Sequence, residues 1–283
     1  MSTEIIISQW LYLVQGLNAK TLSLASWFLI AMFTMAPLEN FFYLRRQPLF
    51  REDFFTDTLY FFISSILPMF VLVVTNGLVM WFFRHTLPDQ WFTFMQATPV
   101  WLRIIAVVAT GDFGYYWAHR WAHEIPFFWR FHSIHHSPQQ IDWLVATRVH
   151  PLDIVFVRGV SFIPVFGLGL LDMSGANIYS LLLVTFNNIW GIFIHANVKF
   201  RFGWLEYVLT TPYFHHWHHA NDNPAVVNKN YAALLPIYDR LFGSLYLPKN
   251  AYPCRYGIST YLPDSFFKQL VYPFVWLLGK KQD

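Results

Sequence analysis

Residues 58–83 read TLYFFISSILPMFVLVVTNGLVMWFF and contain no charged side chain. A helix needs about 20 consecutive apolar residues to cross the hydrocarbon core of a bilayer, so this stretch is long enough to span a membrane. Pro68 and Gly77 lie inside it, and membrane helices tolerate both residue types because neighbouring groups satisfy the backbone that they free. The stretch therefore predicts a spanning α-helix, and with it a helical membrane protein.

The composition of the chain agrees with a membrane protein. Of its 283 residues, 55% are hydrophobic, 20% are aromatic and only 12% are charged, whereas soluble domains carry about 25% charge. The net charge is +3 and there is no basic run suited to nucleic acid, so we expect no nucleic-acid partner. A single cysteine, Cys254, excludes an intramolecular disulfide and a thiolate cage for a metal. The first ten residues lack the basic leader of a secretory signal, so we expect the apolar segments to remain in the membrane.

Three further regions are candidates for membrane segments. Residues 21–36 are uncharged, residues 100–117 are mostly apolar, and residues 154–194 hold two apolar stretches that we interpret as a spanning or re-entrant hairpin. Three arginines in the loop at residues 45–51 should keep that loop in the cytoplasm by the positive-inside rule. We therefore predict an all-α, multi-pass bundle with about four spanning helices and a cytosolic helical cap, which holds the histidines described next.

Eight of the 12 histidines fall into three short motifs. One H-x3-H motif and two H-x2-H-H motifs contain, in chain order, His119, His123, His132, His135, His136, His215, His218 and His219. Residues three and four apart share one face of a helix, so each motif can present two imidazoles to one ion. In an H-x2-H-H motif the last two rings diverge by about 100°, so one motif can serve two adjacent ions. We expect two metal ions with four or five nitrogens each, and His195 as a ninth ligand or, alternatively, an interfacial histidine.

The type of metal is narrowed by what the sequence lacks. Imidazole suits zinc, copper, iron and nickel alike. Structural zinc sites commonly use cysteine, and the soluble di-iron proteins of helix bundles use Glu-x-x-His pairs; this sequence offers neither. A pair of irons bound by histidine alone is the remaining redox candidate.

Several stretches resemble the sequence motifs of one enzyme family. DFGYYWAHRWAH (112–123), WRFHSIHHS (129–137) and TPYFHHWHHA (211–220) are similar to the three histidine boxes of the fatty acid hydroxylase superfamily, also called the sterol desaturase family. NYAA (230–233) and DRLFG (239–243) are similar to its C-terminal signature. The motifs occur in the family's order over residues 111–247. Tyr238 stands where Trp is common and Ala232 where Gly is common, and neither is a ligand position.

The resemblance implies the cofactor and the reaction. It implies a membrane-embedded enzyme with a cytosolic, histidine-bound pair of iron ions, an oxidoreductase that hydroxylates, desaturates or otherwise oxidises a lipid with dioxygen and external electrons. Sterols, fatty acyl chains, sphingoid bases and ether lipids are substrates in the family. The sequence has no haem-attachment, flavin or G-x-G-x-x-G motif. We therefore expect no haem or flavin on this chain, and a cytochrome, ferredoxin or reductase as electron donor.

The resemblance also suggests how the chain is divided. We expect membrane spans in residues 1–110, a catalytic region with the membrane hairpin in residues 111–247, and an interfacial tail in residues 248–283. Within the tail, residues 266–278 are apolar and are expected to lie as a helix at the membrane surface. The two lysines at 280–281 resemble a retrieval signal of the endoplasmic reticulum, but a bacterial inner membrane is favoured, with the active site facing the cytoplasm.

Three polar residues near the motifs have more than one interpretation. His150 precedes a proline and can be a ligand, a hydrogen-bond partner of a ligand or a helix cap. Asp112 lies seven residues before the first motif histidine and can accept the outer N–H of a ligand or bond to Tyr115 or Arg148. His216 points away from its motif partners on a helix, and we expect it to pack in the core or to support a ligand.

Two other functions are consistent with the residues alone. A zinc-dependent membrane hydrolase would need a general base beside the metal, and no H-E-x-x-H motif is present to provide it. A metal carrier would be expected to place histidines along a path inside the spans, whereas these histidines gather at the predicted inner helix ends. We therefore favour the oxygenase.

Overall fold

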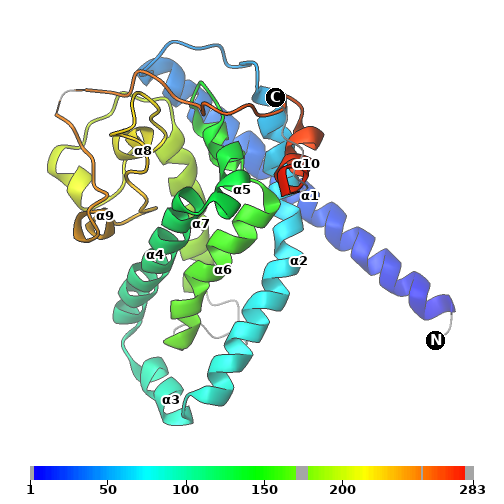
Figure 1. Cartoon of the computed structure of the whole chain (residues 1–283). Helices are drawn as coiled ribbons and strands as arrows, with labels where there is room; N and C mark the ends of the chain where they lie inside the picture. The colour runs from blue at the N-terminus through cyan, green and yellow to red at the C-terminus, as the bar shows by residue number, and fades with distance from the viewer. Residues whose placement is uncertain (1–2, 170–177, 250, 278–283) are drawn as a thin grey trace.

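The computed structural model describes residues 3–169, 178–249 and 251–277, and Figure 1 shows their arrangement. The longer helices are α1 (Thr3–Phe42), α2 (Phe54–Thr86), α4 (Val100–Glu124), α6 (Pro151–Gly167) and α7 (Ile178–His195). The shorter helices are α3 (Asp89–Ala97), α5 (Pro126–His136), the 3-10 helices η1 (Trp143–Thr147) and η2 (Gly203–Tyr207), α8 (Pro212–His218), α9 (Ile237–Leu241) and α10 (Phe266–Leu277). The described residues add only one isolated β-bridge, between Tyr43 and Val198. The predicted all-α fold is confirmed for these ranges.

The described helices provide two or three candidate membrane spans. Residues Leu22–Phe42 of α1 and the whole of α2 are long and apolar enough to cross a bilayer, and only 6% of the apolar window of each is buried within the protein. The exposed side chains of α2 include Phe70, Val74 and Trp81, and an apolar surface of this extent indicates contact with lipid. The pair α3 and α4 passes the same test together, although it is bent by 114°. The chain is therefore a membrane protein.

The segment before α4 and the predicted hairpin both bear on the number of spans. Residues 84–99, between the candidate segments at 58–83 and 100–117, contain α3, which starts after Pro88 and has Asp89 in its first turn. Both features favour a helix N-terminus, because proline presets the backbone and a carboxylate complements the helix dipole. The turn of the predicted hairpin lies at residues 170–177, outside the described residues. Four spans thus remain a prediction.

Helix α6 lies between α2 and α4 and packs against both. Figure 1 shows these helices side by side, with α3 joining one end of α2 to α4 and with α5, α8 and α9 gathered toward the other end. Gly114 of α4 permits the close approach of α6, since a Cβ atom at this position would lie 2.9 Å from the Cα atom of Ser161 and 3.0 Å from its carbonyl oxygen. This contact fixes where α4 presents its histidines.

Substitution of Gly114 by alanine is expected to destabilise the protein by about 1–3 kcal/mol, because the added methyl group would force apart two packed backbones. Gly159→Ala is the matched control, since a Cβ at Gly159 meets nothing within 4 Å and alanine favours a helix over glycine by about 1 kcal/mol. Thermal unfolding in detergent should show a lower midpoint for Gly114→Ala only. Equal midpoints for the two variants would contradict the tight α4–α6 contact.

A buried network of charges joins α2 to the loop before it and to η1. The Arg51 guanidinium donates to Asp142 at 2.7 and 2.8 Å and to Asp57 at 2.6 Å. Arg148 donates to the other oxygen of Asp57 at 3.0 Å, and all four side chains are buried. Asp142 also caps η1 by accepting two of its backbone N–H groups. Because Arg148 follows η1 directly, the network places the segment that leads into α6.

The C-terminal helix α10 packs against α2 and α5. Phe266 meets Tyr60 edge to face, with 4.7 Å between ring centroids, and the buried amide of Gln269 donates to the carbonyl oxygen of Pro263 at 2.7 Å. The helix therefore packs against α5, the helix that carries the second histidine motif, and Phe274 contacts Phe131 of α5. It occupies nearly the range expected for an interfacial helix from the sequence.

Candidate metal centre

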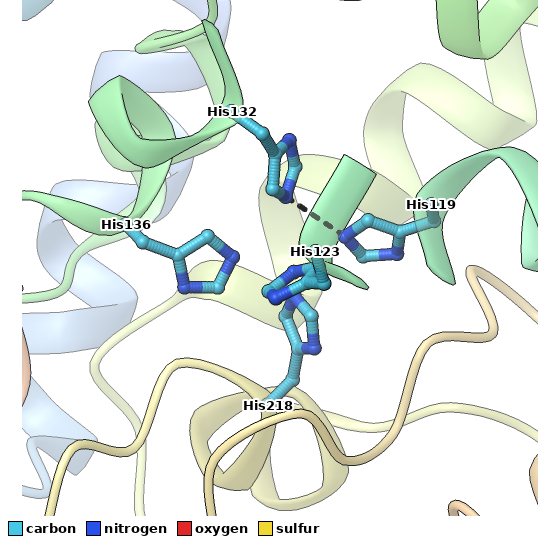
Figure 2. Close-up of side chains that lie close together, drawn as sticks. All are labelled: His119, His123, His132, His136 and His218. Carbon is cyan, nitrogen blue, oxygen red and sulfur yellow. Dashed lines mark hydrogen bonds between the residues drawn. The ribbon is translucent and has the colours of Figure 1, made fainter. Parts of the chain in front are cut away.

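Nine buried histidines form two groups. The first group takes His119 and His123 from α4, His132 and His136 from α5, and His218 from α8. Figure 2 shows these five rings pointing toward one another, and one nitrogen of each lies within 4.8 Å of the corresponding nitrogen of every other. Two consecutive helices, α4 and α5, thus converge on one point with α8 from much later in the chain, and α4 and α5 each contribute two rings that are four residues apart on one face.

The second group lies beside the first. It consists of His135 from α5, His195 at the end of α7, and His215 and His219 from the α8 segment, again with one nitrogen of each within 4.8 Å of the others. The rings of His136 and His219 stack with 4.3 Å between centroids, so the two groups touch. The two H-x2-H-H motifs each divide between the groups, with His135 separated from His136 and His218 separated from the other two members of its motif.

Local sequence signals define where several helices at the site begin. Pro126, Pro151 and Pro212 occupy the first positions of α5, α6 and α8, where the missing N–H of proline costs nothing. The hydroxyl of Thr211 caps α8 by accepting the N–H of Phe214 at 3.3 Å. The second and third motifs therefore begin within two turns of a defined helix start, which sets the direction in which their rings point.

In the first group, the outer nitrogens of two rings determine where their protons lie. Nδ1 of His119 is 2.7 Å from the carbonyl oxygen of Tyr231, and Nδ1 of His132 is 2.8 Å from Oδ2 of Asp153. Both oxygens accept, so each Nδ1 carries the proton and each Nε2 carries a lone pair. The two Nε2 atoms nevertheless face each other at 3.1 Å, along the dashed line of Figure 2. Two lone pairs at this distance fit a site for a cation.

The second group follows the same rule. Nδ1 of His195 donates to the carbonyl oxygen of Gly191 at 2.7 Å, and Nδ1 of His135 donates to that of Arg148 at 3.3 Å. The Nε2 atoms of His195 and His135 are then both acceptors, and they lie 3.2 Å apart. Nε2 of His215 lies 2.8 Å from Nε2 of His195. This donor set also fits a metal ion.

Burial favours the neutral form of His136, His218 and His219, which is the form of the imidazole that binds a metal. Burial, followed by the neighbouring imidazoles, lowers the pKa of His136 and of His219 well below the ordinary value of 6.5. Burial lowers the pKa of His218 to about 3. The inner Nε2 atoms of His136 and His218 have no hydrogen-bond partner among the described residues. Buried imidazole nitrogens without partners are costly unless a ligand meets them, so the residues present fit bound metal.

The other candidate residues lie outside both groups. His150 caps α6, because its Nδ1 accepts the N–H of Leu152 at 3.1 Å while its Nε2 meets the carbonyl oxygen of Leu270 at 3.1 Å. The ring of His216 is buried between the Tyr256 hydroxyl at 2.7 Å and the carbonyl oxygen of Ala196 at 3.0 Å. The structure thus gives His150 the cap that was one of its three interpretations, and His216 a packing role.

Asp112 bonds to neither set of predicted partners. The two interpretations were a ligand histidine, or Tyr115 or Arg148. Instead, its two carboxylate oxygens accept the backbone N–H groups of Leu234 and Leu235 at 3.0 and 2.8 Å. The physical reason is that the segment after Tyr231 crosses α4 and leaves two N–H groups there without a strand or helix to pair them. No sequence pattern indicated this crossing.

The segment at residues 228–232 contacts the outer Nδ1 atoms of two histidines of the first group. Asn228 and Asn230 have positive φ angles of 61° and 58°, a conformation that asparagine tolerates better than most residues. This turn directs the carbonyl of Lys229 to Nδ1 of His218 at 2.9 Å, and that of Tyr231 to His119. Asp239 fastens the segment by accepting the N–H groups of residues 231 and 232. The stretches resembling the C-terminal signature therefore support the histidine motifs.

Sequence reasoning missed Asp153. The available signal was weak: Asp153 is an acidic residue at the start of an apolar stretch, and an ionisable group in such a position usually has a partner. Its partner, His132, lies 21 positions away, and no helical spacing connects the two.

The fold and the site together define a helical membrane protein with a histidine-rich metal site. A family model for fatty acid hydroxylases matches residues 104–244, a range that contains all nine grouped histidines. The chain belongs to the fatty acid hydroxylase family, and the predicted resemblance is confirmed.

Curated relatives are similar over parts of their lengths. The chain is 32% identical to the ornithine lipid hydroxylase OlsE of Rhizobium tropici over 214 residues, which are 75% of this chain and 60% of that protein. It is 32% identical to an alkylglycerol monooxygenase of Danio rerio over 62% of this chain and 37% of that protein. The corresponding figures for the human alkylglycerol monooxygenase are 34%, 54% and 33%. The chain thus spans less than two thirds of each of these relatives. No solved structure matches it.

Proposed function

We propose that the chain is a membrane-bound oxygenase that hydroxylates or desaturates a lipid with dioxygen and external electrons. The observation that carries this proposal is the convergence of nine buried imidazoles, in touching groups of five and four, inside a helical membrane protein. Membership of the fatty acid hydroxylase family supports it, and so do relatives named for hydroxylation of an ornithine lipid and monooxygenation of alkylglycerols.

The proposed metal ions are two irons. The first would be held by His119, His123, His132, His136 and His218, and the second by His135, His195, His215 and His219. Two bound irons would supply the activation of dioxygen for attack on a C–H bond. The residues of this chain would hold the ions through neutral ring nitrogens. The outer N–H groups of five of them are fixed by carbonyl or carboxylate oxygens, an arrangement that orients the rings and raises their basicity; these five are His119, His132, His135, His195 and His218. All nine histidines are buried, which limits the access of water to the site.

The proposed topology has about four spans, in which α1, α2 and the α3–α4 pair cross the membrane and α6 and α7 form a spanning or re-entrant hairpin beside them. Residues 1–110 would form membrane spans, residues 111–247 the catalytic region, and residues 248–283 the tail. The arginine-rich loop at residues 45–51 supports a cytoplasmic position for the histidines. Arg51 of this loop and Arg148 both donate to Asp57, and the carbonyl of Arg148 contacts His135, so the loop and the histidines lie on the same side of the membrane. A bacterial inner membrane is the proposed compartment, with the endoplasmic reticulum as alternative, and the bacterial relative supports it.

The proposed substrate is a lipid with an alkyl chain, and the proposed electron donor is a separate cytochrome, ferredoxin or reductase. The test is to compare by mass spectrometry the lipids of cells with and without the gene, grown under dioxygen labelled with ¹⁸O. Hydroxylation should add one labelled oxygen atom to a lipid class, and desaturation should remove two hydrogen atoms. A product formed equally well without dioxygen would contradict the oxygenase and favour the zinc-dependent hydrolase.

A further inference from the structure

One carboxylate touches the histidine groups. Asp153, in the first turn of α6, has only 3% of its surface exposed. Its Oδ2 lies 2.8 Å from Nδ1 of His132, a member of the first group. The partner is therefore an acceptor that carries a full charge, and hydrogen bonds to a charged acceptor are about twice as strong as those between neutral groups.

The other outer contacts of the grouped histidines are to neutral oxygens. Among the described residues, the Nδ1 atoms with a hydrogen-bond partner meet backbone carbonyls in four cases, at His119, His218, His135 and His195. Both second-group examples, His135 and His195, belong to this neutral class. Among the described residues, the negative charge thus lies next to the first group, whereas His135 and His195 of the second group contact only neutral carbonyl oxygens through Nδ1.

The second oxygen of Asp153 has no hydrogen-bond partner among the described residues. Asp153 lines a small cavity of about 100 Å³ whose other walls are apolar, formed by Phe127, Phe128, Phe131, Leu152 and Phe156. Within the described part of the chain, the ion-pair partner of this carboxylate is His132. A buried carboxylate without a cation is strongly disfavoured, and a metal ion in the first group would provide the missing positive charge through the His132 ring.

We propose that Asp153 is a positioning residue that fixes the Nδ1–H form of His132 and makes the first group bind its metal more tightly than the second. This inference rests on the proposed metal-binding function. An aspartate can only accept from Nδ1, so it holds the Nε2 lone pair toward the group. An asparagine carries no charge and can present either its oxygen or its NH₂ to the ring, so it secures neither the tautomer nor the charge.

The test uses the full-length protein in lipid nanodiscs, with free iron(II) or zinc held at set concentrations by a metal buffer and bound metal counted per chain. Wild type should bind in two steps. Asp153→Asn should weaken the tighter step by about 10–100-fold, the usual loss when an outer partner of a ligand histidine is removed, and leave the weaker step unchanged. Asp153→Ala should weaken the tighter step at least as much, and His132→Ala should weaken it more, which assigns that step to the first group.

Asp112→Asn is the matched control. It also removes the charge of a buried carboxylate, but one that accepts only backbone N–H groups, so both binding steps should stay as in wild type. An intact weaker step in the Asp153 variants shows that they are folded. An unchanged tighter step in Asp153→Asn, or an equal loss of both steps, would reject the inference alone. A wild-type protein that binds no metal would reject the proposed function and the inference with it.

Discussion

His135→Ala is expected to remove one metal ion per chain and to eliminate the oxidised lipid product. His135 contributes one of only four nitrogens in the second group, and its loss leaves three. Nε2 of His195 lies 3.2 Å from Nε2 of His135. In the variant, His195 would lose this neighbouring ligand of the proposed ion. Loss of an outer partner alone costs a metal site about 10–100-fold in affinity, so loss of the ligand itself should cost more. Bound metal per chain and labelled lipid product measure the two effects.

His216→Ala is the matched control for this variant. The ring of His216 is equally buried and lies next to His215 in sequence, yet it contacts Tyr256 and Ala196 rather than a group. Its removal should reduce stability by about 1–3 kcal/mol through the unpaired groups left behind, while the metal content stays at the wild-type level. Normal metal content and product in His135→Ala would contradict the proposed second group, and a loss of metal equal in the two variants would show that the effect is only structural.

Asp57→Ala is expected to destabilise the protein by about 3 kcal/mol. Asp57 is fully buried and lies between two buried guanidinium groups, those of Arg51 and Arg148. Removing one partner of a buried ion pair costs about 3–5 kcal/mol, since it leaves a charge without compensation. The lower end applies because Arg51 keeps Asp142 and Arg148 keeps the half-exposed Asp53. The midpoint of thermal or denaturant unfolding in detergent measures the change.

The control for Asp57 is an ion pair near the surface. Glu124→Gln breaks the contact of Arg120 with Glu124, whose side chains are 25% and 41% exposed, and such pairs contribute about 0–1 kcal/mol. A change in Asp57→Ala no larger than that in Glu124→Gln would contradict the stabilising role of the buried network. A secondary consequence is weaker metal binding, because Arg148 also provides the carbonyl that holds His135.

The membrane character and the ligand-rich motifs were predictable because both depend on short-range periodicity. An uncharged stretch as long as residues 58–83 has few alternatives to a membrane helix, and α2 covers it. The spacing of His132, His135 and His136 places their rings by helix geometry alone, and the structure divides this motif between two groups, as two neighbouring ions require. The number of spans was harder to predict from the sequence, because α3 precedes α4 at a bend of 114° that composition does not encode.

The sequence by itself determined the all-helical class, the membrane location, the family and the residues able to bind metal, since each follows from composition, from a spacing of three or four residues or from a motif. Only the tertiary structure decided which histidine joins which group, that Asp153 supports His132 and that Asp112 holds a crossing segment. These are contacts between residues up to 123 positions apart. They follow from how α4, α5, α6 and α8 converge, and no local pattern records that convergence.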